Sequence, residues 1–155
     1  MDERTKENRE RELRRSANKK FHHEDFSGLD LSTSDFRNAT LIECNFTGTI
    51  LKWSNFEGAN CFGSDFTDAD LYRVNFKEAI LAKTKMFPRD CFGMTVTLTC
   101  DTFQGMEVPD RLLLYWLYMG TMMKVPTEEM SQKIVEAIGR PEFEKLQRAF
   151  KERKF

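Results

Sequence analysis

The 155-residue sequence has the length of one ordinary domain, and 40% of its residues are hydrophobic, which is enough for a folded core. Its 24 basic and 25 acidic residues give a formal net charge of −1, which excludes a polycation that binds nucleic acid through bulk charge. The longest apolar run, residues 112–119, has eight residues, whereas a membrane-spanning helix needs ~20. The first twenty residues are charged throughout and lack the pattern of a signal peptide, so we expect a cytoplasmic protein.

Residues 1–23 are predicted to form a charged N-terminal helix or arm. Residues 1–20 carry five acidic and eight basic side chains, contain no glycine or proline, and have Leu13 as their one sizeable apolar side chain after Met1. A helix that is polar on all sides has little to bury. Two interpretations stay open, a solvated helix held by opposite-charge pairs and a docking arm for an acidic partner. Phe21 is expected to anchor the end of this segment over the structure that follows.

Residues 24–85 repeat with a period of five. Asp or Asn precedes the apolar residue in nine of twelve units, and the residue two positions before it is small in most units. A helix or a strand would scatter these apolar residues over several faces, so each pentapeptide is predicted to form one short side of a coil. Asp and Asn suit the corners because their side chains bond nearby backbone. The twelve apolar positions are Phe26, Leu31, Phe36, Leu41, Phe46, Leu51, Phe56, Cys61, Phe66, Leu71, Phe76 and Leu81.

These units resemble the pentapeptide repeat family, whose consensus is A(D/N)LXX. The resemblance covers residues 24–85 and implies an all-β solenoid, a right-handed quadrilateral β-helix with four pentapeptides per coil and about three coils. In this register phenylalanines stack on phenylalanines from coil to coil, with leucines between them. Both ends of so short a solenoid would expose unpaired backbone and open core, so caps are required.

The repeat decays beyond residue 85. We expect an irregular last turn over residues 86–100, because Cys91 and Val96 keep the five-residue spacing while Pro88 interrupts the rest of the pattern. Residues 101–155 are predicted to form a C-terminal α-helical module that caps the solenoid or docks a partner. Its three helices are expected to begin near Pro109, Pro126 and Pro141.

The sequence contains no recognisable catalytic, cofactor or metal motif. A glycine-rich phosphate loop, HExxH and GxSxG are all missing, and the Asp and Asn residues of the repeat have a structural explanation. His22 and His23 have no partner at metal-ligand spacing. We therefore predict a non-enzymatic protein without cofactor or metal. The cysteines, which lack CxxC spacing and are expected to be reduced thiols, are Cys44, Cys61, Cys91 and Cys100.

Two groups of outward-facing residues form the candidate interaction surface. On the fourth side of the coils Ile42 and Phe62 form an apolar column, and on the second side Trp53 comes near Tyr72 and Arg73 in a cation–π cluster. Aromatic residues and arginine are enriched at binding hot spots. The alternative is that the chain's own arm or helical module covers these patches, with Leu13, Tyr115 or Trp116 as candidate lid residues over the apolar column.

Three functional hypotheses follow. The first is a non-enzymatic protein-interaction or assembly module. The second, implied by the family resemblance, is a DNA-mimicking modulator of DNA gyrase or topoisomerase; residues 24–85 have the required sign, with a net charge of −4, but three coils make a short mimic. The third is a small structural component of a larger particle such as a phage virion. In that case the protein would be located in the virion and not in the cytoplasm. The expected partner is a protein, in a multi-subunit assembly or a homo-oligomer, and we expect neither membrane nor direct nucleic-acid binding.

Overall fold

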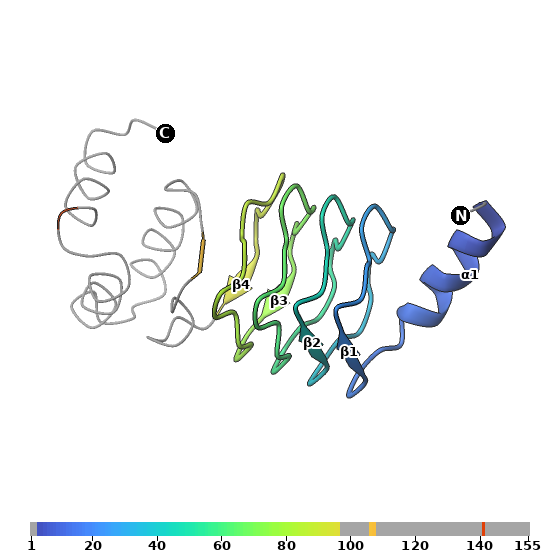
Figure 1. Ribbon diagram of the computed structural model, residues 1–155. Coiled ribbons are helices and arrows are strands. Elements are labelled where there is room, and N and C mark those ends of the chain that lie inside the picture. The colour runs from blue at the N-terminus through green and yellow to red at the C-terminus, as the bar shows by residue number, and fades with distance from the viewer. Residues whose placement is uncertain (1–2, 97–105, 108–140, 142–155) are drawn as a thin grey trace.

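The computed structural model describes residues 3–96, 106–107 and 141. Its elements are the helix α1 (Glu3–Leu13) and the strands β1 (Lys20–His22), β2 (Thr40–Ile42), β3 (Asn75–Phe76) and β4 (Thr95–Val96). Coils of chain stack along one axis, with α1 at the N-terminal end of the stack (Figure 1). The predicted C-terminal helical module lies, except for three residues, outside the described part of the chain and stays a prediction.

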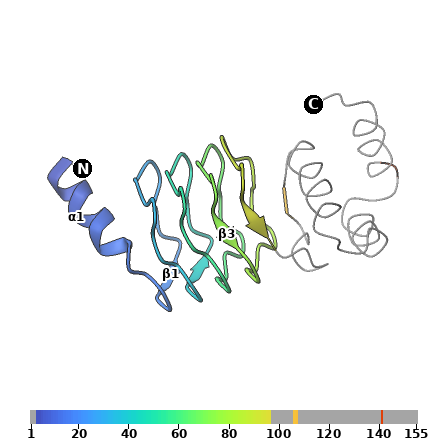
Figure 2. The ribbon, with the colours of Figure 1, turned by 180° about the vertical axis from the view of Figure 1, so that it is seen from behind.

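Adjacent coils are joined by parallel backbone pairing at intervals of 20 residues. Strand β1 pairs with β2 and β3 with β4, and isolated bridges continue the same register around each coil. The result is a β-helix solenoid with four pentapeptides per coil, and Figure 2 shows the stack from behind. One row of paired residues, each a coil apart, contains Arg15, Asp35, Asn55, Asn75 and Thr95.

The solenoid begins before the limit expected from the repeats, and it continues into the last turn expected over residues 86–100. Pairing between coils begins at Arg15, not near residue 24, and continues through β4, so four coils replace the expected three. On the N-terminal side Phe21 occupies the apolar position five residues before Phe26, although charged and histidine side chains surround it. On the C-terminal side the inward spacing persists across Pro88. Backbone pairing therefore tolerates outward-facing residues that depart from the consensus.

The aromatic part of the core consists of two columns of stacked phenylalanines. The ring centroids of Phe46 lie 4.9 Å from those of both Phe26 and Phe66, and Phe56 lies 4.7 Å from Phe36. The two columns meet edge to face, as between Phe46 and Phe56 at 5.9 Å and 77°. Offset stacking and edge-to-face contact are the favoured aromatic arrangements. The predicted stacking of phenylalanine on phenylalanine is confirmed, and all six rings of the two columns are buried.

Each corner is held by the residue that precedes the apolar position. Its Asp or Asn Oδ1 accepts the amide of the residue two positions later in ten units, at 2.9–3.2 Å. The second residue after the apolar position has a positive φ, between 53° and 71° where it is recorded. This left-handed conformation is easy for glycine and costs other residues ~1–2 kcal/mol. The predicted corner role of Asp and Asn is confirmed.

Acidification is expected to weaken the solenoid through these corners. The side-chain hydrogen bond from Arg37 is the main cause that lowers the pKa of Asp35 below its ordinary value of 3.8. Burial is the largest single effect on Asp65 and raises its pKa, but the hydrogen bonds from Thr67 and the charge of Lys85 together outweigh it, so the pKa is lowered. A depressed folded-state pKa stabilises the fold above 3.8 and loses that contribution as the pH falls through the lower value. Urea midpoints should therefore be steady from about pH 6 to about pH 4 and fall below that.

An Asp35→Asn variant is the control for this prediction. Asn55 holds the equivalent corner one coil further on with an uncharged amide. The variant should keep its corner hydrogen bond, lose part of its stability at neutral pH with the Arg37 ion pair, and show a smaller decrease in stability on acidification. A decrease of the same size as in the unmodified protein would show that Asp35 does not contribute to it.

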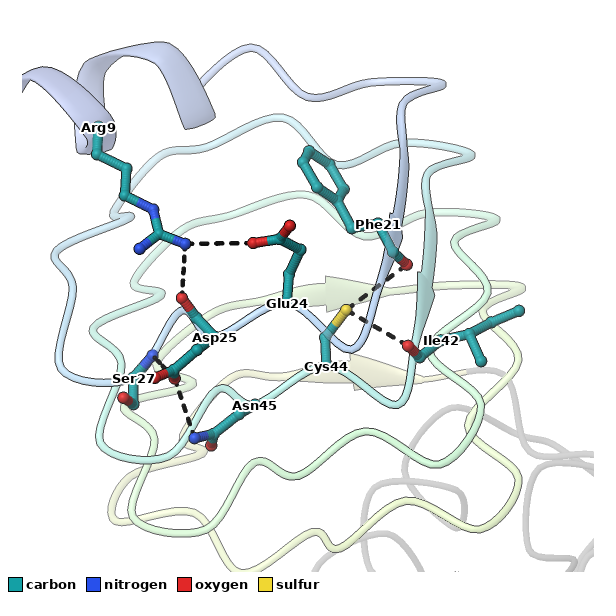
Figure 3. A network of polar contacts seen from close by, with 8 residues as sticks. All are labelled: Arg9, Phe21, Glu24, Asp25, Ser27, Ile42, Cys44 and Asn45. Atoms are coloured by element: carbon teal, nitrogen blue, oxygen red, sulfur yellow. Dashed lines mark hydrogen bonds and ion pairs between the residues drawn. The ribbon is translucent and has the colours of Figure 1, made fainter.

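Helix α1 is attached to the first coil. Leu13 is its buried side chain and belongs to the solenoid core, and Phe21 packs edge to face on Phe26 at 5.4 Å. Arg9 reaches from the helix to the Glu24 carboxylate and donates to the carbonyl oxygen of Asp25 at 2.8 Å (Figure 3). The segment predicted as a solvated helix or docking arm therefore contacts its own solenoid.

Two side chains of α1 replace backbone groups of a missing coil. Within the stack, the amide of Asp70 donates to the carbonyl of Thr49 on the preceding coil at 2.9 Å. The equivalent amide of Asp30 has no preceding coil and donates to Glu10 Oε1 at 2.7 Å. Arg9 in the same way supplies the donor for the Asp25 carbonyl, so the helix satisfies backbone groups on the open edge of the first coil.

A row of buried hydroxyls shows where this replacement is incomplete. Ser54 Oγ donates to the carbonyl of Leu31, one coil back, at 2.8 Å, and Ser64 Oγ donates to that of Leu41 at 2.6 Å. The corresponding atom of Ser34, one coil before Ser54, is a buried oxygen without a hydrogen-bond partner among the described residues.

Alanine substitutions of Ser54 and Ser34 should have different effects on stability. Ser54→Ala leaves a buried carbonyl without its hydroxyl donor and should lower the free energy of unfolding by about 1–2 kcal/mol. Ser34→Ala removes a hydroxyl that has no partner and should leave stability unchanged or raise it. Urea unfolding of the two variants tests this order, and an equal loss in both would contradict the assignment.

Candidate protein-interaction surface

Four side chains on the second side of the coils form one exposed group, called here the aromatic–arginine cluster. Trp53, Tyr72 and Phe92 come from three successive coils. The ring centroids of Trp53 and Tyr72 lie 5.7 Å apart, and Phe92 stacks on Tyr72 at 6.0 Å. The Arg73 guanidinium carbon lies 4.6 Å from the Trp53 centroid and 5.5 Å from that of Tyr72. The cluster therefore runs along the solenoid axis as a continuous aromatic surface that carries one cation.

The cluster places large apolar groups in water and strains the backbone. Trp53 is 54% exposed and Phe92 is 62% exposed, the two largest values among the apolar side chains that the structure describes. Trp53 also has a φ of 61°. The same left-handed conformation recurs at the corresponding residue of the other units, where glycine often stands, and it is unfavourable for a side chain as bulky as that of tryptophan. Neither feature adds to the stability of the isolated fold.

The charges around the cluster are unevenly paired. Asp70 Oδ2 lies 3.3 Å from Lys52 Nζ and 3.4 Å from an Arg89 nitrogen, so one carboxylate serves two cations. Asp90 accepts the amide of Phe92 at its corner. Arg73 has no carboxylate within ion-pair distance in the described ranges 3–96 and 106–107. The local charge is therefore positive, although residues 24–85 as a whole have a net charge of −4.

The predicted apolar column on the fourth side is less exposed than the cluster. Ile42, at the end of β2, and Phe62 are both half-buried, and the next residue of the column, Ala82, is buried. Lys83 Nζ lies 5.3 Å from the Phe62 ring centroid and covers part of it. The exposed apolar residue on this side is Ile80, at 48%.

The structure thus brings together Trp53, Tyr72 and Arg73, and places Ile42 and Phe62 on a different side. Of the predicted lid residues, Leu13 is buried in the solenoid core, and Tyr115 and Trp116 lie outside the described part of the chain. Phe92 was not among the predicted site residues. Its signal was present, because Phe92 follows the apolar position at Cys91 as Tyr72 follows Leu71, but the decay of the consensus near Pro88 concealed it.

The described residues offer no evident reactive centre. Among them no group of three or more His, Cys, Asp or Glu side chains is placed to hold a metal ion. Burial raises the pKa of the Cys44 and Cys61 thiols, which makes them poor nucleophiles at neutral pH. Cys44 Sγ lies 3.6 Å from the carbonyl oxygens of Phe21 and Ile42 (Figure 3). In the same part of the chain no helix is long and apolar enough to cross a membrane.

Comparison with known proteins identifies the repeat. The family model for pentapeptide repeats matches residues 21–58 and 54–86, in eight copies. Residues 21–86 therefore consist of pentapeptide repeats, as the sequence predicted. The sequence has no match among the curated proteins.

Several solved structures are similar to this chain at low sequence identity. A pentapeptide repeat protein from the thylakoid lumen of Arabidopsis thaliana is 23% identical, with a TM-score of 0.46, and the match covers 66% of this chain and 77% of that one. Trypsin-treated QnrB1, a plasmid-mediated fluoroquinolone resistance protein, is 18% identical over 61% of this chain and 57% of its own, with a TM-score of 0.34. HetL, from Nostoc sp. strain PCC 7120 and involved in heterocyst differentiation regulation, is 19% identical over 57% and 38%, with a TM-score of 0.22.

Proposed function

We propose that this protein is a non-enzymatic interaction module that binds a protein partner through the aromatic–arginine cluster on its second side. The observation that carries the proposal is the exposure of Trp53 and Phe92 on a rigid stack of coils, beside an arginine without an ion-pair partner among the described residues. Tryptophan, tyrosine and arginine are the residues that dominate binding energy at protein interfaces.

The solenoid supports this role mechanically. Tyr72 is held between Trp53 and Phe92 by ring contacts, and the backbone beneath it is paired to the coils on both sides. A surface that is already ordered loses little conformational entropy when a partner binds. The proposal includes a right-handed, four-sided coil, because connections between parallel strands are almost always right-handed. It also includes residues 101–155 as a helical cap or a second docking element.

Quantitative co-purification from the native source tests the proposal. Trp53→Gly removes one exposed outer ring of the cluster and relieves the left-handed strain, so the variant should fold at least as well as the unmodified protein and lose its partner. Ile80→Thr is the matched control, because it removes an exposed apolar side chain on another side and should leave the partner bound.

Retention of the partner by Trp53→Gly, together with an unchanged melting temperature, would overturn the proposal. Loss of the partner only in Ile80→Thr would assign the contact to the fourth side instead. A supercoiling assay with purified gyrase tests the DNA-mimic hypothesis. An effect on gyrase that persists in the Trp53→Gly variant would not depend on the cluster.

A further inference from the structure

We propose that the partner segment presents a carboxylate next to an apolar or aromatic side chain, and that the Arg73 guanidinium binds this carboxylate. The inference rests on the proposed function and specifies the chemistry of its partner. The apolar part of the segment would lie on Trp53 and Phe92, and the carboxylate would lie at the guanidinium edge.

The position of Arg73 leaves its hydrogen-bond donors available. The Arg73 guanidinium carbon lies 4.6 Å from the Trp53 ring centroid and 5.5 Å from that of Tyr72, and the N–H donors of a guanidinium lie in the plane of the group. Arg73 is exposed, and its side chain makes no hydrogen bond or ion pair within the described part of the chain. An arginine stacked on an aromatic ring is oriented in advance for a two-point hydrogen bond to a carboxylate.

A glycine one coil further on makes room for this arginine. A Cβ atom added at Gly93 would lie 2.8 Å from Arg73 Cγ and 3.7 Å from its Cδ. Any larger residue at position 93 would therefore push the arginine away from the place it now occupies. The orientation of Arg73 thus depends on two coils in addition to its own, with Gly93 on one side and Trp53 on the other.

The surrounding charges favour a carboxylate over a nucleic acid. Lys52 and Arg89 share Asp70, which leaves Arg73 as the cation of the cluster without an ion pair in the described ranges. One free cation suits a single carboxylate, whereas a nucleic-acid strand is bound by a row of cations along its phosphates. The net charge of −4 over residues 24–85 would repel a polyanion at the flanks of the cluster.

Selection of a phage-displayed random decapeptide library on the full-length protein tests the inference. Enriched peptides should carry Asp or Glu beside an aromatic or aliphatic residue. Their affinity, measured by fluorescence anisotropy, should fall roughly ten- to hundredfold with Arg73→Met, which keeps the alkyl chain, and Arg73→Lys should recover part of the loss. Gly93→Ala should weaken binding without changing any charge. Thermal melting of each variant confirms that the fold is intact.

The outcomes separate this inference from the proposed function. Enriched peptides without carboxylates, lost with Trp53→Gly but unaffected by Arg73→Met, would overturn the inference and leave the proposed function in place. Peptides insensitive to Trp53→Gly, or no enrichment at all, would overturn both. Displacement of the peptides by an oligothymidylate that binds the same cluster would contradict the inference in favour of single-stranded nucleic acid.

Discussion

Replacing Phe46 or Phe56 by alanine is expected to lower the free energy of unfolding by about 3–5 kcal/mol. Both rings are fully buried, and each contacts its neighbours one coil before and one coil after as well as rings of the other column. Backbone pairing on both sides of each coil prevents the stack from collapsing into the space left by the ring. Urea unfolding followed by circular dichroism measures the loss.

Phe92→Ala is the control for the core variants. Its ring is large but mostly exposed, so the loss should stay below about 1 kcal/mol. If Phe46→Ala and Phe56→Ala also lost less than about 1 kcal/mol, the two inner columns would not be the main source of stability.

Leu13→Ala is expected to release helix α1 from the solenoid and to lower the free energy of unfolding by about 2–3 kcal/mol. Leu13 is the one described residue of α1 that is buried, and the rest of the helix is polar. A short helix without a packed face is marginal in water. When the helix separates, Glu10 can no longer accept the amide of Asp30.

Hydrogen exchange at two equivalent amides measures this release. Protection of the Asp30 amide should fall strongly in the variant, whereas the Asp70 amide, which donates to Thr49 on the preceding coil, should keep its protection. Equal loss at both amides would mean that Leu13 supports the whole solenoid. No loss at Asp30 would mean that the polar contacts of Arg9 and Glu10 hold the helix without it.

The central coils of the solenoid could be predicted from the sequence, because the five-residue pattern that specifies them is repeated many times. A period of five between Phe26 and Leu81 predicts the short-sided coil, and the alternation of Phe and Leu predicts which rings stack. Aspartate and asparagine before the apolar position predict the corner hydrogen bonds. Each of these inferences relies on a local rule that the chain applies at every unit.

The ends of the solenoid and most of its surface do not follow from such a rule. The first coil carries Ser16 and Phe21 at the correct spacing, but they lie among charged residues that also suit a helix. The use of Glu10 as a substitute carbonyl depends on how α1 lies against the coil, which a sequence pattern does not contain. Phe92 joins Tyr72 only because the coil continues past Pro88.

Site-specific photocrosslinking in cells that express the protein natively tests the central claim most directly. A benzophenone amino acid replaces either Phe92, in the aromatic–arginine cluster, or Phe87, which is 39% exposed on a neighbouring side. Both changes exchange one aromatic residue for another and leave the buried columns intact. A crosslinked partner from position 92 and none from position 87 is the predicted result. Crosslinks of equal strength from both positions, or from position 87 alone, would contradict the assignment of the interaction surface to this cluster.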